Sequence, residues 1–284
     1  MNVLDLKEIE TAPDSSFWDS DRGELRFMVR IDDCHVPVLV RSKNECNDTL
    51  LVTYNGAIQR SKAPDGVVFQ RSSWLDDFQS SVIQIADPTM VKHDRLQLGW
   101  GQFTKENWAI EGIVGILEAL RNRFGFVGAE NTLHYGSSAG GFQAICCATL
   151  DRGSIALVNN PQLDWSFYSE RYVEALLRDV FEGSTLEDIK ANSPWRVSVV
   201  DFFECVGYVP ETEVLLNVAS AGDFERQLKP ALSKLETVRS LGKKPALSFN
   251  LYHDENLGHN PLGKPYTIEK INSKLYDIRS SKSE

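Results

Sequence analysis

The stretch HYGSSAGGFQAI, residues 134–145, contains the pattern Gly-x-Ser-x-Gly with Ser138 at its centre. The residues before it, 131–136, read as a short strand, and the small residues from Ala139 onward are typical of a buried helix. Glycines two positions either side of Ser138 let a strand and a helix pack backbone to backbone. The stretch predicts a sharp strand–helix turn that presents Ser138, although a glycine-rich turn without chemistry would use the same residue types.

The chain around this turn alternates between two patterns. Short apolar stretches typical of strands cover 49–54, 81–87, 154–160, 213–219 and 246–252, and a hairpin is predicted over 24–31 and 36–41. An apolar stripe predicts a helix between Thr104 as N-cap and Gly125 as the residue after its end, and another helix closes the chain. This order predicts an α/β fold with a mostly parallel central sheet flanked by helices.

Residues 162–210 break the alternation, because they are rich in aromatic side chains with helical spacing and contain no clear strand. We interpret this segment as a helical cap insertion, and residues 1–161 and 211–284 as the core. Trp165 and Tyr168 of the segment, together with Asn55, are candidate substrate-binding residues. The same aromatic side chains would equally serve as the insertion's own core.

Composition excludes several classes of function. The chain has 284 residues, a formal net charge of −10 and no Lys/Arg-rich run, so we expect no nucleic-acid partner. No long apolar stretch predicts a membrane span, and the N-terminus lacks the pattern of a signal peptide. Five cysteines without paired spacing favour reduced thiols and a cytoplasmic location. The spacing of histidines and cysteines predicts no metal site, and no cofactor motif is present.

A reactive serine needs a base, and the base needs an acid that orients it. Asp223 follows the strand predicted over 213–219, and His259 follows the one over 246–252. Both lie where the carboxyl ends of parallel strands gather functional side chains. The sequence therefore predicts that Ser138, Asp223 and His259 work together, with His253 as an alternative base and Asp164 as an alternative acid.

Acyl chemistry at a serine also needs two N–H donors for the oxyanion. The N–H of Ala139, directly after the serine, is one candidate. Gly56 or Ala57, in the loop after the strand over 49–54, would supply the other, since glycine lets the backbone turn an N–H inward. An ordinary Asn-Gly turn is the alternative reading of this loop.

The segments TYNGA, YGSSAGGFQA, SAGD and LGHNP together resemble the α/β-hydrolase-fold serine hydrolases over about residues 48–162 and 211–280. With LGWGQF (98–103) and VNNPQLD, the chain is loosely similar to α/β-hydrolase-like proteins of bacterial surface-glycan and accessory-secretion gene clusters, some of which act on sugar acetyl groups. The resemblance implies Ser138 as nucleophile, His259 as general acid/base and Asp223 as its orienting acid. Asn-Gly replaces the His-Gly that common esterases carry in the oxyanion loop.

These observations predict a serine hydrolase of the esterase or deacylase type, which acts on a small-molecule or glycan-linked ester through an acyl-enzyme. An acyltransferase or a peptidase with the same three residues is the alternative, and a non-catalytic binding protein is a further one. The sequence leaves the acyl group, the acceptor and the oligomeric state open.

Overall fold

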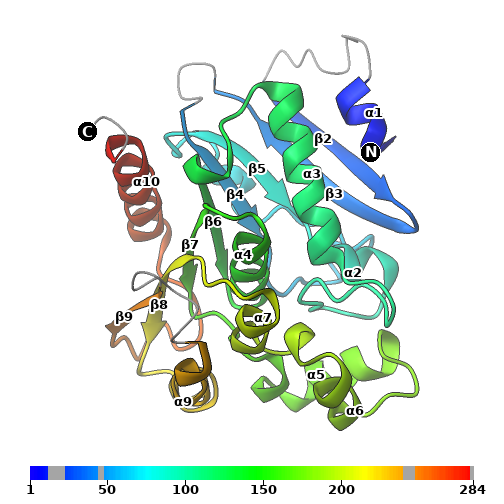
Figure 1. Ribbon diagram of the computed structural model, residues 1–284, viewed down its shortest axis with the longest axis vertical. Helices are drawn as coiled ribbons and strands as arrows, with labels where there is room; N and C mark the ends of the chain where they lie inside the picture. Colours follow the sequence, from blue (N-terminus) through cyan, green and yellow to red (C-terminus); the bar gives the residue numbers. More distant parts are fainter. Residues whose placement is uncertain (12–22, 44–47, 239–246, 282–284) are drawn as a thin grey trace.

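The computed structural model describes residues 1–11, 23–43, 48–238 and 247–281. Residue 246, the first of the predicted strand over 246–252, lies outside them. The described residues form one nine-stranded sheet in the order β1-β2-β3-β5-β4-β6-β7-β8-β9 (Figure 1). The strands are β1 (Asn2–Asp5), β2 (Glu24–Ile31), β3 (Cys34–Arg41), β4 (Leu50–Tyr54), β5 (Ser81–Ile85), β6 (Thr132–Ser137), β7 (Ile155–Asn159), β8 (Glu211–Asn217) and β9 (Leu247–Tyr252).

Most neighbouring strands run parallel. All pairings from β5 through β4, β6, β7 and β8 to β9 are parallel, whereas β3 pairs antiparallel with both β2 and β5. The predicted hairpin and the mostly parallel sheet are confirmed. Strand β1, which pairs parallel with β2, was not predicted, because four residues are too few to show a period.

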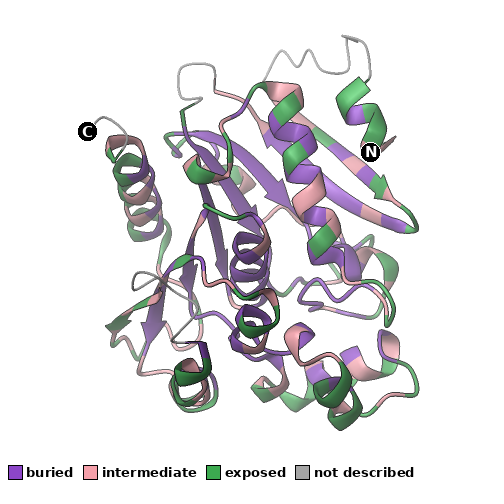
Figure 2. Ribbon diagram, in the orientation of Figure 1, coloured by how far each residue is buried: buried purple, intermediate pink, exposed green. Residues whose placement is uncertain are grey.

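Helices cover both faces of the sheet (Figures 1 and 2). On one face α1, α3, α4, α7 and α9 pack against one another in a row, and α4 is buried along nearly its whole length. On the other face α10 contributes Ile271, Leu275 and Ile278 to a second core that includes Leu133 and Tyr135 of β6. The helices are α1 (Leu6–Thr11), α2 (Pro88–Lys92), α3 (Ala109–Phe124), α4 (Ala139–Leu150), α5 (Glu170–Asp179), α6 (Leu186–Asn192), α7 (Val199–Val206), α8 (Ala221–Asp223), α9 (Lys229–Val238) and α10 (Lys264–Ser280), with short helical turns η2 (Ser72–Trp74), η3 (Ala129–Asn131), η4 (Trp165–Phe167), η5 (Pro194–Arg196) and η6 (Phe224–Leu228).

Helix α3 begins later than the sequence predicts. Its N-cap is Trp108 rather than Thr104, whose hydroxyl instead accepts a hydrogen bond from the Asn107 N–H within the preceding loop. The predicted end is confirmed, since Gly125 adopts a left-handed conformation with φ 62°. The hydroxyl of a capping residue can accept a hydrogen bond from a loop N–H as readily as from the first N–H groups of a helix. The N-cap prediction was wrong because tertiary contacts decide between the two.

The segment 162–210 is helical, as expected: it contains η4, α5, α6, η5 and α7 and no named strand. A single bridge joins Asp164 to Ser198 near its two ends. Helix α7 packs against α4 of the sheet's helical layer, whereas α5 and α6 lie at the periphery (Figure 1). Its role as a cap over a site stays a prediction.

A buried polar network joins strands β4 and β6 to helix α3 and the end of α4. The His134 ring contacts the Tyr54 hydroxyl through Nδ1 at 2.8 Å and the Asp151 carboxylate through Nε2 at 2.9 Å. Arg121 pairs with both oxygens of Asp151. Burial alone would raise the pKa of Asp151, but hydrogen bonds from Arg121 and His134 lower it below its usual range. His134 is thus a structural residue of the interior.

Candidate active site

Ser138 stands on a strained turn between β6 and α4. Its backbone has φ 56° and ψ −126°, in a region that non-glycine residues rarely occupy. The turn is tight because a Cβ at Gly136 would collide with the Gly140 carbonyl, and one at Gly140 would lie 2.7 Å from the Tyr54 carbonyl oxygen. Only glycine fits at these two positions, so the pattern Gly-x-Ser-x-Gly has here the packing role that the sequence predicts.

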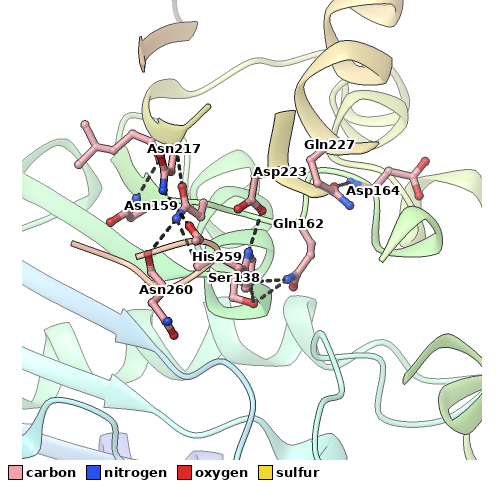
Figure 3. A network of polar contacts seen from close by, with 12 residues as sticks. Ser138, Asn159, Gln162, Asp164, Asn217, Asp223, Gln227, His259 and Asn260 are labelled. Atoms are coloured by element: carbon pink, nitrogen blue, oxygen red, sulfur yellow. Dashed lines mark hydrogen bonds and ion pairs between the residues drawn. The ribbon is translucent and has the colours of Figure 1, made fainter. Parts of the chain in front are cut away.

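Ser138, His259 and Asp223 form a continuous chain of hydrogen bonds (Figure 3). His259 Nδ1 lies 2.7 Å from Asp223 Oδ1, and His259 Nε2 lies 2.9 Å from Ser138 Oγ. A carboxylate only accepts hydrogen bonds, so Nδ1 carries the proton and Nε2 is left to accept from the serine hydroxyl. Asp223 is buried and His259 is one-third exposed. The arrangement can take a proton from Ser138 Oγ and stabilise the imidazolium that results.

The two alternative residues lie outside this chain of contacts. Asp164 caps η4, where its carboxylate accepts hydrogen bonds from the Ser166 N–H and hydroxyl. Burial raises the pKa of Asp164, and the bonds from Ser166 oppose that shift. Within the described part of the chain, no hydrogen bond joins His253 to Ser138 or Asp223. The structure therefore brings together the residues that the sequence placed first.

Three asparagines hold the loop that carries His259. Asn160 Nδ2 donates to the carbonyls of His259 and Asn260, and Asn217 Nδ2 donates to those of Asp254 and Gly258. Asn159 Oδ1 accepts from the Leu262 N–H farther along the loop. Figure 3 shows Asn159 and Asn217 at the ends of β7 and β8, beside this loop. The sequence analysis missed all three, although NN in VNNPQLD ends a predicted strand.

The candidate oxyanion loop lies against Ser138. A Cβ at Gly56 would be 3.3 Å from the Ser137 carbonyl and 3.6 Å from Ser138 Cβ. The Gly56 N–H already donates to Gln70 Oε1 at 3.0 Å. Among the described residues, neither the Ala57 nor the Ala139 N–H donates a hydrogen bond. These two N–H groups are therefore the ones free to meet a new acceptor.

Asn55 shapes this loop from inside. Its side chain is buried, accepts from the Asp87 N–H at 2.7 Å and donates to the Gly56 carbonyl at 3.1 Å. Both ends of its amide are thus engaged with backbone groups. This geometry fits a residue that holds the oxyanion loop in place.

The two aromatic candidates differ in position. Trp165 is fully buried, and its indole N–H donates to the Arg196 carbonyl at 2.6 Å, so it offers no surface to a ligand. The Tyr168 ring centre lies 5.6 Å from that of His259. Tyr168 also lines a cavity of about 190 Å³ beside His259. A cavity of about 410 Å³ lies elsewhere, around Trp108 and Arg196, and neither Ser138 nor His259 lines it.

The sequence analysis also missed Gln162, which directly follows Pro161 in VNNPQLD. Its side-chain nitrogen lies 2.6 Å from Ser138 Oγ and 3.2 Å from His259 Nε2 (Figure 3). Its side-chain oxygen accepts from the Trp100 indole N–H at 3.0 Å. Trp100 belongs to LGWGQF, so two stretches that the sequence analysis noted meet at Ser138.

The described ranges contain no group of three or more His, Cys, Asp or Glu side chains arranged to hold a metal ion. No helix within them is both long and apolar enough to cross a membrane.

No protein-family model matches this chain, and neither does any curated protein. Solved structures do resemble it. The capsule O-acetyltransferase of Neisseria meningitidis serogroup A is 14% identical with a TM-score of 0.57, over 88% of this chain and 96% of that one. Porphyromonas gingivalis dipeptidyl peptidase 4 is 12% identical with a TM-score of 0.60, over 89% of this chain and 35% of that one. The Francisella virulence factor BioJ is 12% identical with a TM-score of 0.56, over 96% and 88%.

At these identities the similarity establishes the fold, which is the α/β-hydrolase fold. The expected resemblance to that fold is confirmed.

Proposed function

We propose that this protein is a serine hydrolase of the esterase or deacylase type, in which Ser138 carries the acyl group. One observation carries the proposal: a hydrogen-bond chain from Ser138 through His259 to buried Asp223, built on a strained strand–helix turn. Strain at a non-glycine residue is expected where a side chain must be presented in one orientation. The α/β-hydrolase fold supports the same reading, since it places such a turn at the carboxyl edge of its sheet.

Acylation uses each group in one role. Ser138 Oγ forms a bond to the ester carbonyl carbon while its proton passes to His259 Nε2. The carbonyl π electrons move to the oxygen, which the Ala57 and Ala139 N–H groups receive. When the carbonyl re-forms, the bond to the leaving oxygen breaks, and His259 returns the proton to that oxygen. Asp223 stays ionised and holds the imidazolium in place.

Deacylation repeats these steps with a new nucleophile. A water molecule gives its proton to His259 Nε2 as its oxygen bonds to the acyl carbon, and the carbonyl then re-forms with release of Ser138 Oγ, which recovers the proton. We propose that the segment 162–210 borders the path to this step, because Tyr168 lies against His259 and lines the neighbouring cavity.

A second function uses the same acyl-enzyme with a sugar hydroxyl in place of water. It is favoured by the similarity to the capsule O-acetyltransferase, which extends over 96% of that protein. The steps are those of hydrolysis, with the sugar hydroxyl supplying the proton and the oxygen that water supplies there. Peptide hydrolysis is a weaker alternative, because the similarity to dipeptidyl peptidase 4 covers only 35% of that chain.

Labelling with a fluorophosphonate probe tests the proposal. We expect wild type to be labelled and Ser138→Ala to be unlabelled. Ser137→Ala is the matched control, since it removes the adjacent hydroxyl, which accepts from Arg71 at 2.8 Å and does not contact His259. Equal labelling of wild type and Ser138→Ala would refute the role of Ser138. A panel of p-nitrophenyl esters, with and without acetylatable sugars, then separates hydrolysis from transfer.

A further inference from the structure

The proposed reaction leaves one contact of the nucleophile without a role. Gln162 Nε2 lies 2.6 Å from Ser138 Oγ, which is hydrogen-bond distance. Gln162 is fully buried, and its backbone N–H donates to the Ser138 carbonyl at 3.2 Å. Gln162 therefore contacts Ser138 twice, once through its backbone N–H and once through its side-chain amide.

The orientation of this amide follows from its other partner. The Trp100 indole N–H is only a donor, so the group that faces it must be the amide oxygen. The amide nitrogen is then the end that faces Ser138 Oγ. Reversal would set two donors against each other at Trp100. It would also place an oxygen acceptor beside the serine hydroxyl, where it would compete with His259 for the proton.

Trp100 is itself held in a costly conformation. Its φ is 52° and its side chain is fully buried. Asp87 fixes the loop around it: Oδ2 accepts from the Gly101 N–H at 3.0 Å, and burial raises the pKa of this carboxyl against the opposing effect of its hydrogen bonds. Strain at a fully buried tryptophan needs a physical reason, and the hydrogen bond from its indole N–H to Gln162 provides one.

From these contacts we propose that Gln162 is a catalytic residue that stabilises negative charge on Ser138 Oγ, and that Trp100 is the positioning residue that fixes the Gln162 amide. The inference rests on the proposed function. The serine oxygen has two lone pairs, of which the amide N–H occupies one and leaves the other for the carbonyl carbon.

Charge develops on this oxygen twice. It appears as the proton leaves for His259 before the new bond is complete, and again as the acyl–oxygen bond breaks in deacylation. A fixed N–H donor stabilises the negative charge on Ser138 Oγ at both steps, without reorganisation and without exchanging a proton. Gln162 should therefore affect both half-reactions, unlike a residue that contacts only the leaving group.

The test compares Gln162→Met, which keeps the length but removes the N–H, with Gln162→Glu, which keeps the shape but offers only an acceptor. We expect each to lower both the fluorophosphonate labelling rate and kcat on p-nitrophenyl acetate, by roughly 10- to 100-fold for Gln162→Met, and more for Gln162→Glu because a carboxylate repels charge on Ser138 Oγ. Wild-type rates in a folded Gln162→Met or Gln162→Glu protein would overturn the proposal. Thermal unfolding first shows which of the two variants is folded, and the rates of each folded variant are then compared with wild type.

Trp100→Phe tests the positioning role. It removes the indole N–H but keeps an aromatic ring, and we expect a smaller loss than for Gln162→Met. In a Gln162→Met background the same change should add no further loss, because its effect passes through Gln162. Trp108→Phe is the control: its indole nitrogen has no hydrogen-bond partner among the described residues, so activity should stay at the wild-type level. An equal fold-loss of activity from Trp100→Phe in the wild-type and Gln162→Met backgrounds would overturn the positioning role.

The outcome separates this inference from the proposed function. If wild type itself shows no Ser138-dependent labelling, the serine hydrolase proposal fails. If labelling depends on Ser138 but not on Gln162, only the inference about Gln162 fails.

Discussion

Gly140→Ala should weaken both the fold and the site, and the size of the effect follows from one contact. A Cβ at position 140 would lie 2.7 Å from the Tyr54 carbonyl oxygen, whereas ordinary contact begins near 3.4 Å. The start of α4 and the end of β4 must therefore separate by about 0.7 Å. The hydrogen bond from Gln143 Nε2 to the Asn55 carbonyl, now 3.2 Å, would then exceed hydrogen-bond range.

The two effects can be given magnitudes. Overpacking of this kind costs about 1–3 kcal/mol, and loss of the hydrogen bond costs about 1 kcal/mol more. The free energy of unfolding should fall by about 2–4 kcal/mol, which lowers Tm by roughly 3–7 °C. The Ala57 N–H moves with the loop, so a probe that needs the oxyanion donors should react about tenfold more slowly or worse.

Thermal unfolding and the fluorophosphonate labelling rate measure these two quantities. Gly115→Ala is the matched control, because Gly115 lies inside α3 and a Cβ there would meet only Leu6 Cδ2 at 3.9 Å. Helix propensity predicts that this change stabilises the protein by about 0.5–1 kcal/mol and leaves labelling unchanged. A Gly140→Ala protein with wild-type Tm and labelling would refute the argument that close backbone packing sets the turn.

Two further predictions concern the histidines. His259→Ala should lower kcat on the best ester by roughly 10²–10⁴-fold while the protein stays folded by circular dichroism, and inactivity of His253→Ala instead would show that the base is misassigned. His134→Gln should flatten the pH dependence of stability. Burial lowers the pKa of His134 from its ordinary 6.5 despite the opposing Asp151 carboxylate, so the unfolded chain takes up the proton first as the pH falls. The stability that neutral His134 provides is present above about pH 6.5 and is lost below it, by up to about 1.4 kcal/mol per pH unit. Urea unfolding between about pH 7.5 and 5.5 measures this slope, and equal slopes in wild type and His134→Gln would contradict it.

The residues that the sequence placed at the site were found through position as well as type. Asp223 and His259 both follow predicted strands, and the carboxyl ends of parallel strands meet at one edge of the sheet. Ser138 was recognisable because its glycine neighbours report a close backbone approach that few other turns require. A local pattern plus one rule of topology was enough for these three residues.

Other features could not be predicted because they depend on partners far away in the chain. The N-cap of α3 is Trp108 rather than the expected Thr104, because hydrogen bonds to Asp87 and Thr89, near α2, hold the preceding loop in a non-helical conformation. Gly56 lies against Ser138, yet its N–H, one of the expected oxyanion donors, donates to Gln70 instead. Neither set of contacts produces a periodicity or a spacing pattern in the sequence near the residue whose role it decides.

The largest gap concerns the uncharged amides. Asn159, Asn160, Gln162 and Asn217 connect the site's loops, and the sequence analysis assigned a role to none of them. An amide has a donor end and an acceptor end, so a single side chain can join two backbone segments with no ionic partner. Asn160 does so, since its nitrogen holds the loop of His259 while its oxygen accepts from the Asn217 N–H.

The same chemistry explains why amides suit this position. A carboxylate could not donate to the loop carbonyls, and a lysine could not accept from a strand-end N–H, so neither could replace Asn160 at both ends. An amide also keeps its hydrogen bonds across the pH range in which the protein is folded, because it does not titrate. The loop contacts that these amides make therefore do not depend on pH, and the proposed role of Gln162 as a fixed donor uses the same property. Motif patterns identify the groups that could exchange protons, whereas several of the side chains that hold the loops around them are uncharged amides.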